Sequence, residues 1–282
     1  MPLRGGFIVP DKKQIVIHHD DLGGSHGANM AFVALWDMGL VTSGSVMVPC
    51  PWFPEIAAIA RARPELDLGV HLTLTSEFEM FRWRPLTGVR DNGLCDGDGF
   101  FWRDVAHARN ADPAAVEAEL RAQIETALAA GIDATHLDSH MGAVWMPEFF
   151  DIYLRLGQEF GLPIAVTRDL DRIGADPDQL AAAIPRLEAR GVPICETFVT
   201  TPFDRPVADA ATYRQIFAAA KPGLNWGAFH FAAPGDMELF SGDSRLRTSE
   251  YDLFRSGKAR ALLDEAGLEP VGLRAVRDAM RR

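Results

Sequence analysis

Apolar and polar positions along the chain follow two alternating patterns. Short apolar runs rich in β-branched residues, typical of buried parallel strands, alternate with longer segments in which apolar residues recur with a helical period. The predicted strands are 14–19, 41–48, 67–74, 134–140, 163–168, 192–199, 224–231 and 268–273. The predicted helices are 25–39, 54–63, 112–131, 147–160, 178–190, 208–220, 256–266 and a short basic helix that ends at residue 282. This alternation predicts repeated βα units.

Seven or eight strands without an internal linker favour one α/β domain over residues 1–282, folded as a single (β/α) barrel. A doubly wound open sheet is the alternative. The first βα turn reads HHDDLGGSHG, which lacks GxGxxG, and no GxxxxGK[ST] occurs, so no motif supports nucleotide binding. Segment 75–110 has no clear period and is expected to be a long insertion on the active face of the barrel.

Composition and charge narrow the class of protein. With 282 residues, 48 % of them hydrophobic and 24 % charged, the chain is neither disordered nor collagenous nor a small disulfide-stapled domain. A net charge of −11 gives no attraction to phosphate backbones or anionic lipid, so we expect no nucleic-acid and no membrane partner. Three single cysteines and the lack of any long apolar run or leader-like start predict a cytoplasmic protein.

Candidate chemistry gathers where predicted strands end, which in a parallel barrel is the reactive face. Four places carry histidine or aspartate there: HHDD at 18–21, His71, HLDSH at 136–140, and His230. Adjacent carboxylates such as Asp20 and Asp21 raise one another's pKa unless a cation is present, and a divalent metal removes that cost. Because side chains alternate along a strand, we expect these two to point to opposite sides. The alternative is a turn that caps the helix at Ser25.

Two further segments supply imidazoles. His71 lies within an apolar strand, where a hydrogen-bonded core histidine is the alternative to a ligand. His136, Asp138 and His140 share one face of their strand, and His140 is the outermost of the three. We expect His140 to be a ligand and Asp138 to orient an imidazole, against the alternative of a polar barrel layer without metal.

These residues form a set of one carboxylate and two imidazoles from three strand ends: Asp21, His71 and His140. Three protein ligands and an open position are typical of a hydrolytic metal site, where a bound water is acidified. Such a donor set leans towards zinc over magnesium, and both stay open.

The sequence resembles the YdjC-like carbohydrate (chitooligosaccharide) deacetylase family. The resemblance rests on IVIHHDDLGGSHGAN at 15–29, GLVTSG followed by an apolar strand, GVHLTLT at 69–75, THLDSHMG at 135–142 and ARALLDEAGLEPVGLR at 259–274. It is weakest over 76–112 and 170–245. It implies a distorted, TIM-like barrel similar to polysaccharide deacetylases, with one divalent metal, that hydrolyses the linear amide of an N-acetylated amino sugar or oligosaccharide.

Roles for individual residues also follow from the resemblance. It implies the metal ligands Asp21, His71 and His140, with Asp20 as general base. His230 falls where the family has a late-strand histidine and would protonate the leaving amine. Arg168, which closes PIAVTR, matches an arginine that pairs with the catalytic carboxylate.

Several alternatives stay open at this level. A metal-dependent sugar isomerase would need more carboxylate ligands, and Glu196 is the obvious extra candidate. A non-catalytic sugar-binding relative is the other alternative. The aromatics of 75–110, among them Trp83 and Trp102, either stack on sugar rings or cover a satellite core. A homodimer is also left open.

Overall fold

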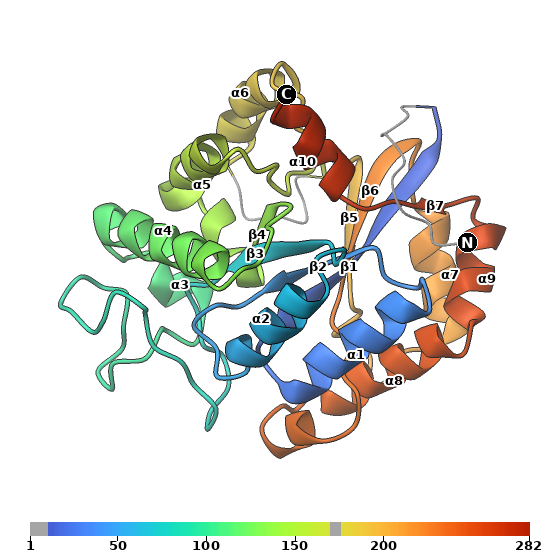
Figure 1. The fold of residues 1–282 in the computed structure, drawn as a ribbon, viewed down its shortest axis with the longest axis horizontal. Helices are drawn as coiled ribbons and strands as arrows, with labels where there is room; N and C mark the ends of the chain where they lie inside the picture. Colours follow the sequence, from blue (N-terminus) through green and yellow to red (C-terminus); the bar gives the residue numbers. More distant parts are fainter. Residues whose placement is uncertain (1–10, 170–175) are drawn as a thin grey trace.

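A computed structural model describes residues 11–169 and 176–282 and places them in an α/β fold around one curled parallel sheet (Figure 1). Segment 1–10, where we expect no targeting sequence, lies outside the described residues. Within the described ranges, no helix is both long and apolar enough to cross a bilayer.

The sheet has seven strands, and every pairing between them is parallel. The strands are β1 (Lys13–Leu22), β2 (Ser43–Val46), β3 (Leu68–Leu72), β4 (Leu137–Ser139), β5 (Thr197–Thr200), β6 (Gly223–Phe229) and β7 (Glu269–Pro270). Their order is β4-β3-β2-β1-β6-β5, and β7 pairs with the start of β1. The carboxyl ends of β1, β3, β4 and β6 therefore meet at one edge, which positions the polar residues that follow them.

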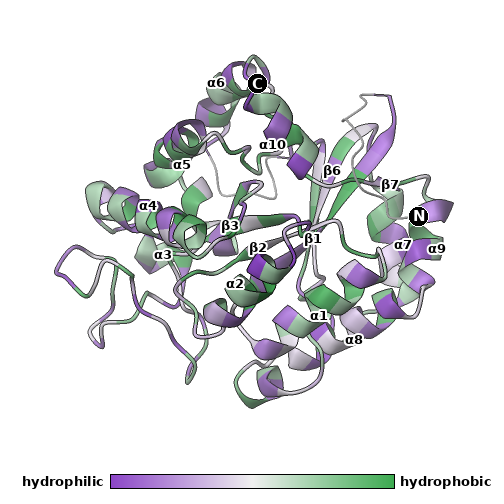
Figure 2. Ribbon diagram, viewed as in Figure 1, coloured by the Kyte–Doolittle hydropathy of each residue, from purple (hydrophilic) through white to green (hydrophobic). Residues whose placement is uncertain are grey.

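Helices cover the outside of the sheet, and most carry both hydrophobic and hydrophilic residues (Figure 2). They are α1 (His26–Asp37), α2 (Phe53–Ala62), α3 (Val105–Ala108), α4 (Pro113–Ala129), α5 (Pro147–Phe160), α6 (Pro177–Glu188), α7 (Ala210–Ala218), α8 (Ser244–Arg255), α9 (Lys258–Glu265) and α10 (Arg274–Met280), with 3₁₀ helices η1 (His140–Trp145) and η3 (Asp236–Leu239). The Ser25 side chain caps α1 by accepting from the Ala28 N–H. The Asp20–Asp21 pair is therefore not needed as the cap.

The expected barrel is confirmed only in part, because the strands form a curled half-barrel that no continuous ladder closes. Segment 163–168, expected to be a strand, makes isolated bridges, from Ile164 to Leu137 on one side and from Thr167 to Cys195 on the other. Pro163 begins this segment, and Pro193 lies in the expected strand 192–199. Neither residue has an N–H to donate to a ladder, which explains why 163–168 forms no regular strand and why β5 begins only at Thr197.

The last third of the chain holds more helix than the periodicity predicts. The expected helix 256–266 is present as α9, but α8 precedes it, and Gly257, at φ 80°, separates the two. α8 is strongly polar overall and buries Leu246, Leu253 and Phe254, of which the last two belong to the main core. Segment 75–110 is largely irregular, as expected, with α3 near its end.

Candidate metal centre

The two aspartates at the end of β1 face the same site. The ladder between β1 and β2 is irregular between His19 and Leu22, and Asp21 has a positive φ of 64°. This left-handed conformation turns the Asp21 side chain out of the strand alternation. The expectation that Asp20 and Asp21 point to opposite sides is therefore wrong: Asp20 Oδ2 lies 4.0 Å and Asp21 Oδ1 lies 3.4 Å from the same His71 nitrogen.

The three expected ligands come together. Asp21 Oδ1 lies 3.1 Å from His140 Nδ1 and 3.4 Å from His71 Nε2, and all three side chains are buried. One ligand atom from each lies within 4.8 Å of the others. His71 is on β3, and His140 begins η1 directly after β4. A carboxylate and two imidazoles converging from three strand ends can hold a divalent cation.

Hydrogen bonds on the far side of each imidazole leave its other ring nitrogen directed at Asp21 Oδ1. The Ser45 hydroxyl donates its hydrogen to Asp138 Oδ2 at 2.8 Å, so it accepts from His71 Nδ1 at 3.0 Å. Asp138 Oδ1 lies 2.9 Å from the same Nδ1. His140 Nε2 lies 3.0 Å from Glu77 Oε2. Such outer partners are typical of metal-binding imidazoles, and here Asp138 orients His71.

The same hydrogen-bond partners determine the protonation of His140 and His71. Burial alone would lower the pKa of His140, but Glu77 and Asp21 outweigh it and raise this pKa to about 9. Likewise Asp138 and the carboxylates of the site raise the pKa of His71 well above its usual range, against the effect of burial. Without a cation, both imidazoles therefore hold protons that a metal ion would have to displace.

Arg247, on α8, fixes the outer oxygen of Asp21. Its Nη1 donates to Asp21 Oδ2 at 2.7 Å, and its Nε donates to Asp243 Oδ2 at 3.0 Å. Burial would raise the pKa of Asp21, but the imidazoles around it and this guanidinium hold it well below its usual range. Asp21 thus stays ionised, with Oδ1 directed at the two histidines.

His230 follows β6 and lies across the site from the ligands. Its Nε2 is 3.8 Å from Asp20 Oδ2, and burial lowers its pKa, so the ring is neutral near pH 7. Its Nδ1 lies 3.0 Å from the Thr201 hydroxyl, which donates to both oxygens of Glu250. Since the Thr201 hydrogen is used on Glu250, His230 donates from Nδ1, and Nε2 faces Asp20 without a hydrogen.

Arg168 is not brought to Asp20 or Asp21. It forms ion pairs with Glu188 and, at 3.4 Å, with Glu196, and its side chain is 40 % exposed. Glu196, the candidate extra ligand of the isomerase alternative, is thereby engaged away from the centre. Within the described residues, the guanidinium that contacts Asp21 is that of Arg247 on α8, and the ring that contacts Asp20 Oδ1 is that of His18 on β1.

Among the residues of the site that sequence reasoning missed are Ser45, Glu77, Arg247 and Glu250. The sequence does carry a signal for Glu77, because this carboxylate closely follows GVHLTLT, the predicted strand that holds the expected ligand His71. Arg247 and Glu250 have none, because α8 was not predicted. Their three-residue spacing puts them on one helix face, but the polarity of α8 conceals which face is buried.

In segment 75–110, Trp83 and Phe101 belong to the main hydrophobic core and Phe78 and Phe81 pack against it, so these four aromatics do not form a separate satellite core. Trp83 is buried and donates from Nε1 to the Thr75 carbonyl, and Phe81 stacks on Phe240. The aromatic side chain exposed at the centre is Phe203, 48 % exposed with its ring 4.9 Å from that of His230.

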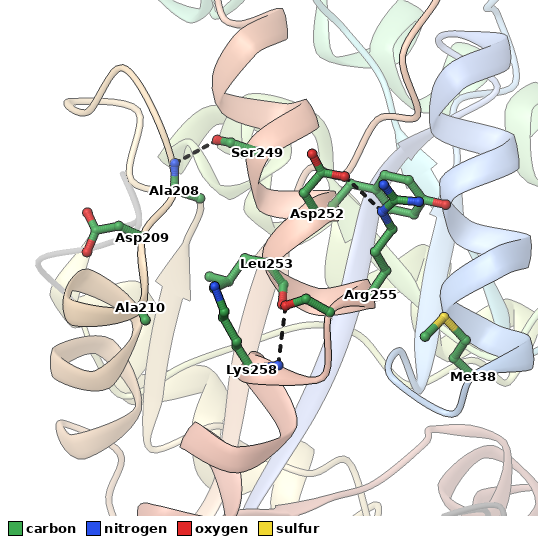
Figure 3. Close-up of a pocket in the computed structure, with 11 residues that line it drawn as sticks. Met38, Ala208, Asp209, Ala210, Ser249, Asp252, Leu253, Arg255 and Lys258 are labelled. Carbon is green, nitrogen blue, oxygen red and sulfur yellow. Dashed lines mark hydrogen bonds and ion pairs between the residues drawn. The ribbon is translucent and has the colours of Figure 1, made fainter.

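A hollow of about 850 Å³ lies away from the centre, between α7, α8 and α9 (Figure 3). It is lined by residues such as Met38, Asp209, Ser249 and Lys258, and by none of the aspartates and histidines above. This hollow therefore lies outside the candidate metal centre.

Comparisons with known proteins agree over most of the chain. A carbohydrate deacetylase of Thermus thermophilus is 35 % identical over 95 % of this chain and 96 % of its own length. A carbohydrate deacetylase of Brevibacillus brevis is 34 % identical over 54 % of this chain and 58 % of its own. A crystal structure from Enterococcus faecalis, named for cellobiose-phosphate cleavage, shares the fold, with a TM-score of 0.77, 21 % identity, and coverage of 94 % of this chain and 99 % of that one. The YdjC-like protein model matches residues 14–265, so the chain belongs to the YdjC-like family.

Proposed function

We propose that this protein is a metal-dependent hydrolase that removes the acetyl group from an N-acetylated amino sugar or oligosaccharide. The observation that carries the proposal is the convergence of Asp21, His71 and His140, with a further carboxylate, Asp20, beside them. The names of the relatives, carbohydrate deacetylases, supply the substrate class.

The metal would be held by Asp21 Oδ1, His71 Nε2 and His140 Nδ1, which are the atoms left free by Arg247, Ser45 and Glu77. What a divalent metal supplies at such a site, when bound, is Lewis-acid polarisation of a carbonyl and a lower pKa for the attacking water. Two imidazoles and one carboxylate favour zinc over magnesium.

The remaining steps belong to side chains. Asp20 Oδ2 accepts a proton as the water oxygen bonds to the acetyl carbon. The C–N bond then breaks, and the amine nitrogen takes a proton. His230 Nε2, without a hydrogen at rest and 3.8 Å from Asp20 Oδ2, is placed to pass the proton from that carboxyl to the amine. Water and amide become acetic acid and the free amine, which at neutral pH exchange one further proton to give acetate and the ammonium form, so the protons balance.

Phe203 is proposed as a platform for the sugar. Phe203 is 48 % exposed and its ring contacts that of His230, so a sugar bound over it would place its N-acetyl group near the candidate metal centre. Cytoplasmic location and a homodimer stay predictions from the sequence.

The decisive experiment measures acetate release from N-acetylglucosamine and its β-1,4-linked oligomers, before and after removal of metal by a chelator. We expect release that is lost with the chelator and restored by added zinc or magnesium. His71→Ala, which removes a ligand, is the matched inactive variant. Absence of release from every sugar, with metal bound in stoichiometric amount, would contradict the proposal.

A further inference from the structure

A buried chain of hydrogen bonds runs from Asp20 into the interior of the half-barrel. His18 lies on β1 two residues before Asp20, and its Nδ1 is 2.5 Å from Asp20 Oδ1. Its Nε2 is 2.9 Å from Nε2 of His136. His136 Nδ1 is 3.0 Å from the Thr135 hydroxyl, which donates to Asp67 Oδ1 at 2.6 Å. All five side chains are buried, so each hydrogen in the chain must be accounted for.

Asp67 fixes the direction of the chain at its inner end. Its Oδ2 accepts from the backbone N–H groups of Leu273 and Arg274, at 2.7 and 2.8 Å. Its Oδ1 accepts from the hydroxyls of Ser43 and Thr135. Four donors surround this carboxylate, so the single hydroxyl hydrogen of Thr135 is directed at Asp67.

The direction of the Thr135 hydrogen bond determines the donor and acceptor roles of the next two side chains, the imidazoles of His136 and His18. Since its hydrogen is used on Asp67, the Thr135 oxygen accepts from His136 Nδ1–H. Burial lowers the pKa of His136 to about 3, so this ring is neutral and its Nε2 carries a lone pair. His18 must therefore donate to it from Nε2–H. The ring of His136 occupies the space beside Gly69, where a Cβ would lie 2.4 Å from its atoms.

We infer that His18 is a positioning residue for the reaction proposed above: it donates one ring hydrogen to His136 and holds Asp20 through the other. The inference rests on the proposed function for the role of Asp20, and on hydrogen-bond direction for the rest. With Oδ1 bound to His18, Asp20 has only Oδ2 left to accept a proton, and that oxygen faces His71 and His230.

A second metal ion is the competing explanation, because His18, His136 and Asp138 could also converge on a cation. Two observations favour hydrogen bonds. The ring nitrogens of His18 and His136 lie at hydrogen-bond distance, and Asp138 already accepts from Ser45 and contacts His71. Asp138 Oδ2 is also 3.7 Å from His18 Nε2, further than the imidazole partner.

The first test is spectroscopic and independent of turnover. The protein is labelled with ¹⁵N-histidine, loaded with diamagnetic zinc, and examined by NMR without substrate, and the variants His18→Asn and His136→Gln assign the signals. We expect hydrogen on Nδ1 alone in His136, and hydrogen on Nε2 of His18 with a second one shared between its Nδ1 and Asp20. Hydrogen on Nε2 of His136, or a bare Nε2 in His18, would overturn the inference.

The second test uses two variants that each keep half of the arrangement. The amide of His18→Asn replaces Nδ1 and can still donate to Asp20, whereas that of His18→Gln replaces Nε2 and reaches only His136. We expect kcat to fall about 100-fold in His18→Gln and about 10-fold in His18→Asn, with KM unchanged and one metal ion retained. Equal losses in both variants would overturn the positioning role.

Remaining outcomes separate the two proposals. A second metal ion, bound by the unaltered protein and lost in His136→Gln, would overturn the hydrogen-bond chain. The expected NMR pattern in a protein that releases no acetate would support the chain and contradict the proposed function alone.

Discussion

Arg247 donates from Nη1 to Oδ2 of Asp21 over 2.7 Å, although 226 residues separate the two in sequence. This bond joins α8, near the end of the chain, to β1, near its start. It leaves Asp21 only Oδ1 with which to bind a cation. The geometry of the candidate metal centre thus depends on a helix that contributes none of the three candidate ligands.

Removing this guanidinium is predicted to weaken metal binding. In Arg247→Gln, Asp21 loses the partner that holds it ionised and oriented, so the affinity for zinc should fall about 10–100-fold. Competition with a chromophoric chelator measures it. Arg255→Gln is the matched control, since Arg255 is on the same helix and pairs only with exposed Asp252 in the described structure. Equal affinities in both variants would contradict the role of Arg247.

Asp20→Asn is predicted to separate binding from turnover. Because Asp20 is the proposed base and not a ligand, the variant should keep one metal ion and lose roughly 100-fold or more in kcat. Elemental analysis and acetate release give the two values. Turnover close to that of the unaltered protein would exclude Asp20 as the base.

Metal binding is predicted to release protons. Before binding, the raised pKa values of His140, about 9, and of His71 keep both rings protonated at pH 7.5. The bound forms are neutral, so about two protons should be released per ion, and affinity should fall as the pH is lowered. A pH-stat titration with zinc measures this.

The same titration also tests the effect of Glu77 on His140. Without this carboxylate the pKa of His140 is lower, so Glu77→Gln should release fewer protons, tending towards one. Glu79→Gln, an exposed change in the same segment, should behave like the unaltered protein. Identical proton release in all three proteins would show that Glu77 does not govern His140.

Phe203→Ala is predicted to raise KM about tenfold for the best oligosaccharide, the equivalent of ~1.4 kcal/mol, with a smaller change in kcat. The reason is loss of the exposed ring on which the sugar is proposed to stack, while Phe203→Tyr retains it. Leu239→Ala, at a position 83 % exposed, is the control for general loss of apolar surface. A fall in kcat alone would argue against a binding role.

Arg168→Ala is predicted to leave turnover within about twofold of the unaltered protein. Its side chain is half exposed and pairs with Glu188 and Glu196, and exposed pairs of this kind contribute little to stability. A loss of about 100-fold would contradict its placement here and support the role that the family resemblance implies.

The sequence predicted the strand ends well, because strand periodicity and histidine spacing are local. The convergence of Asp21, His71 and His140 follows from parallel strands that share one edge. The prediction that Asp20 and Asp21 point to opposite sides failed for a reason that is also local. The alternation of side chains along β1 breaks at Asp21, whose φ is positive, and the apolar and polar pattern of the sequence does not show this. Arg247 and Glu250 required the long-range packing of α8, which its polar composition does not reveal.

Gly69 constrains which substitutions the buried histidine chain can accept during evolution. A side chain at position 69 and an imidazole at position 136 compete for one volume, since a Cβ would approach the ring to 2.4 Å. Neither residue can be exchanged freely while the other persists. Among homologues, bulk at 69 should therefore appear only where 136 has become small, and such lineages would need another way to hold Asp20.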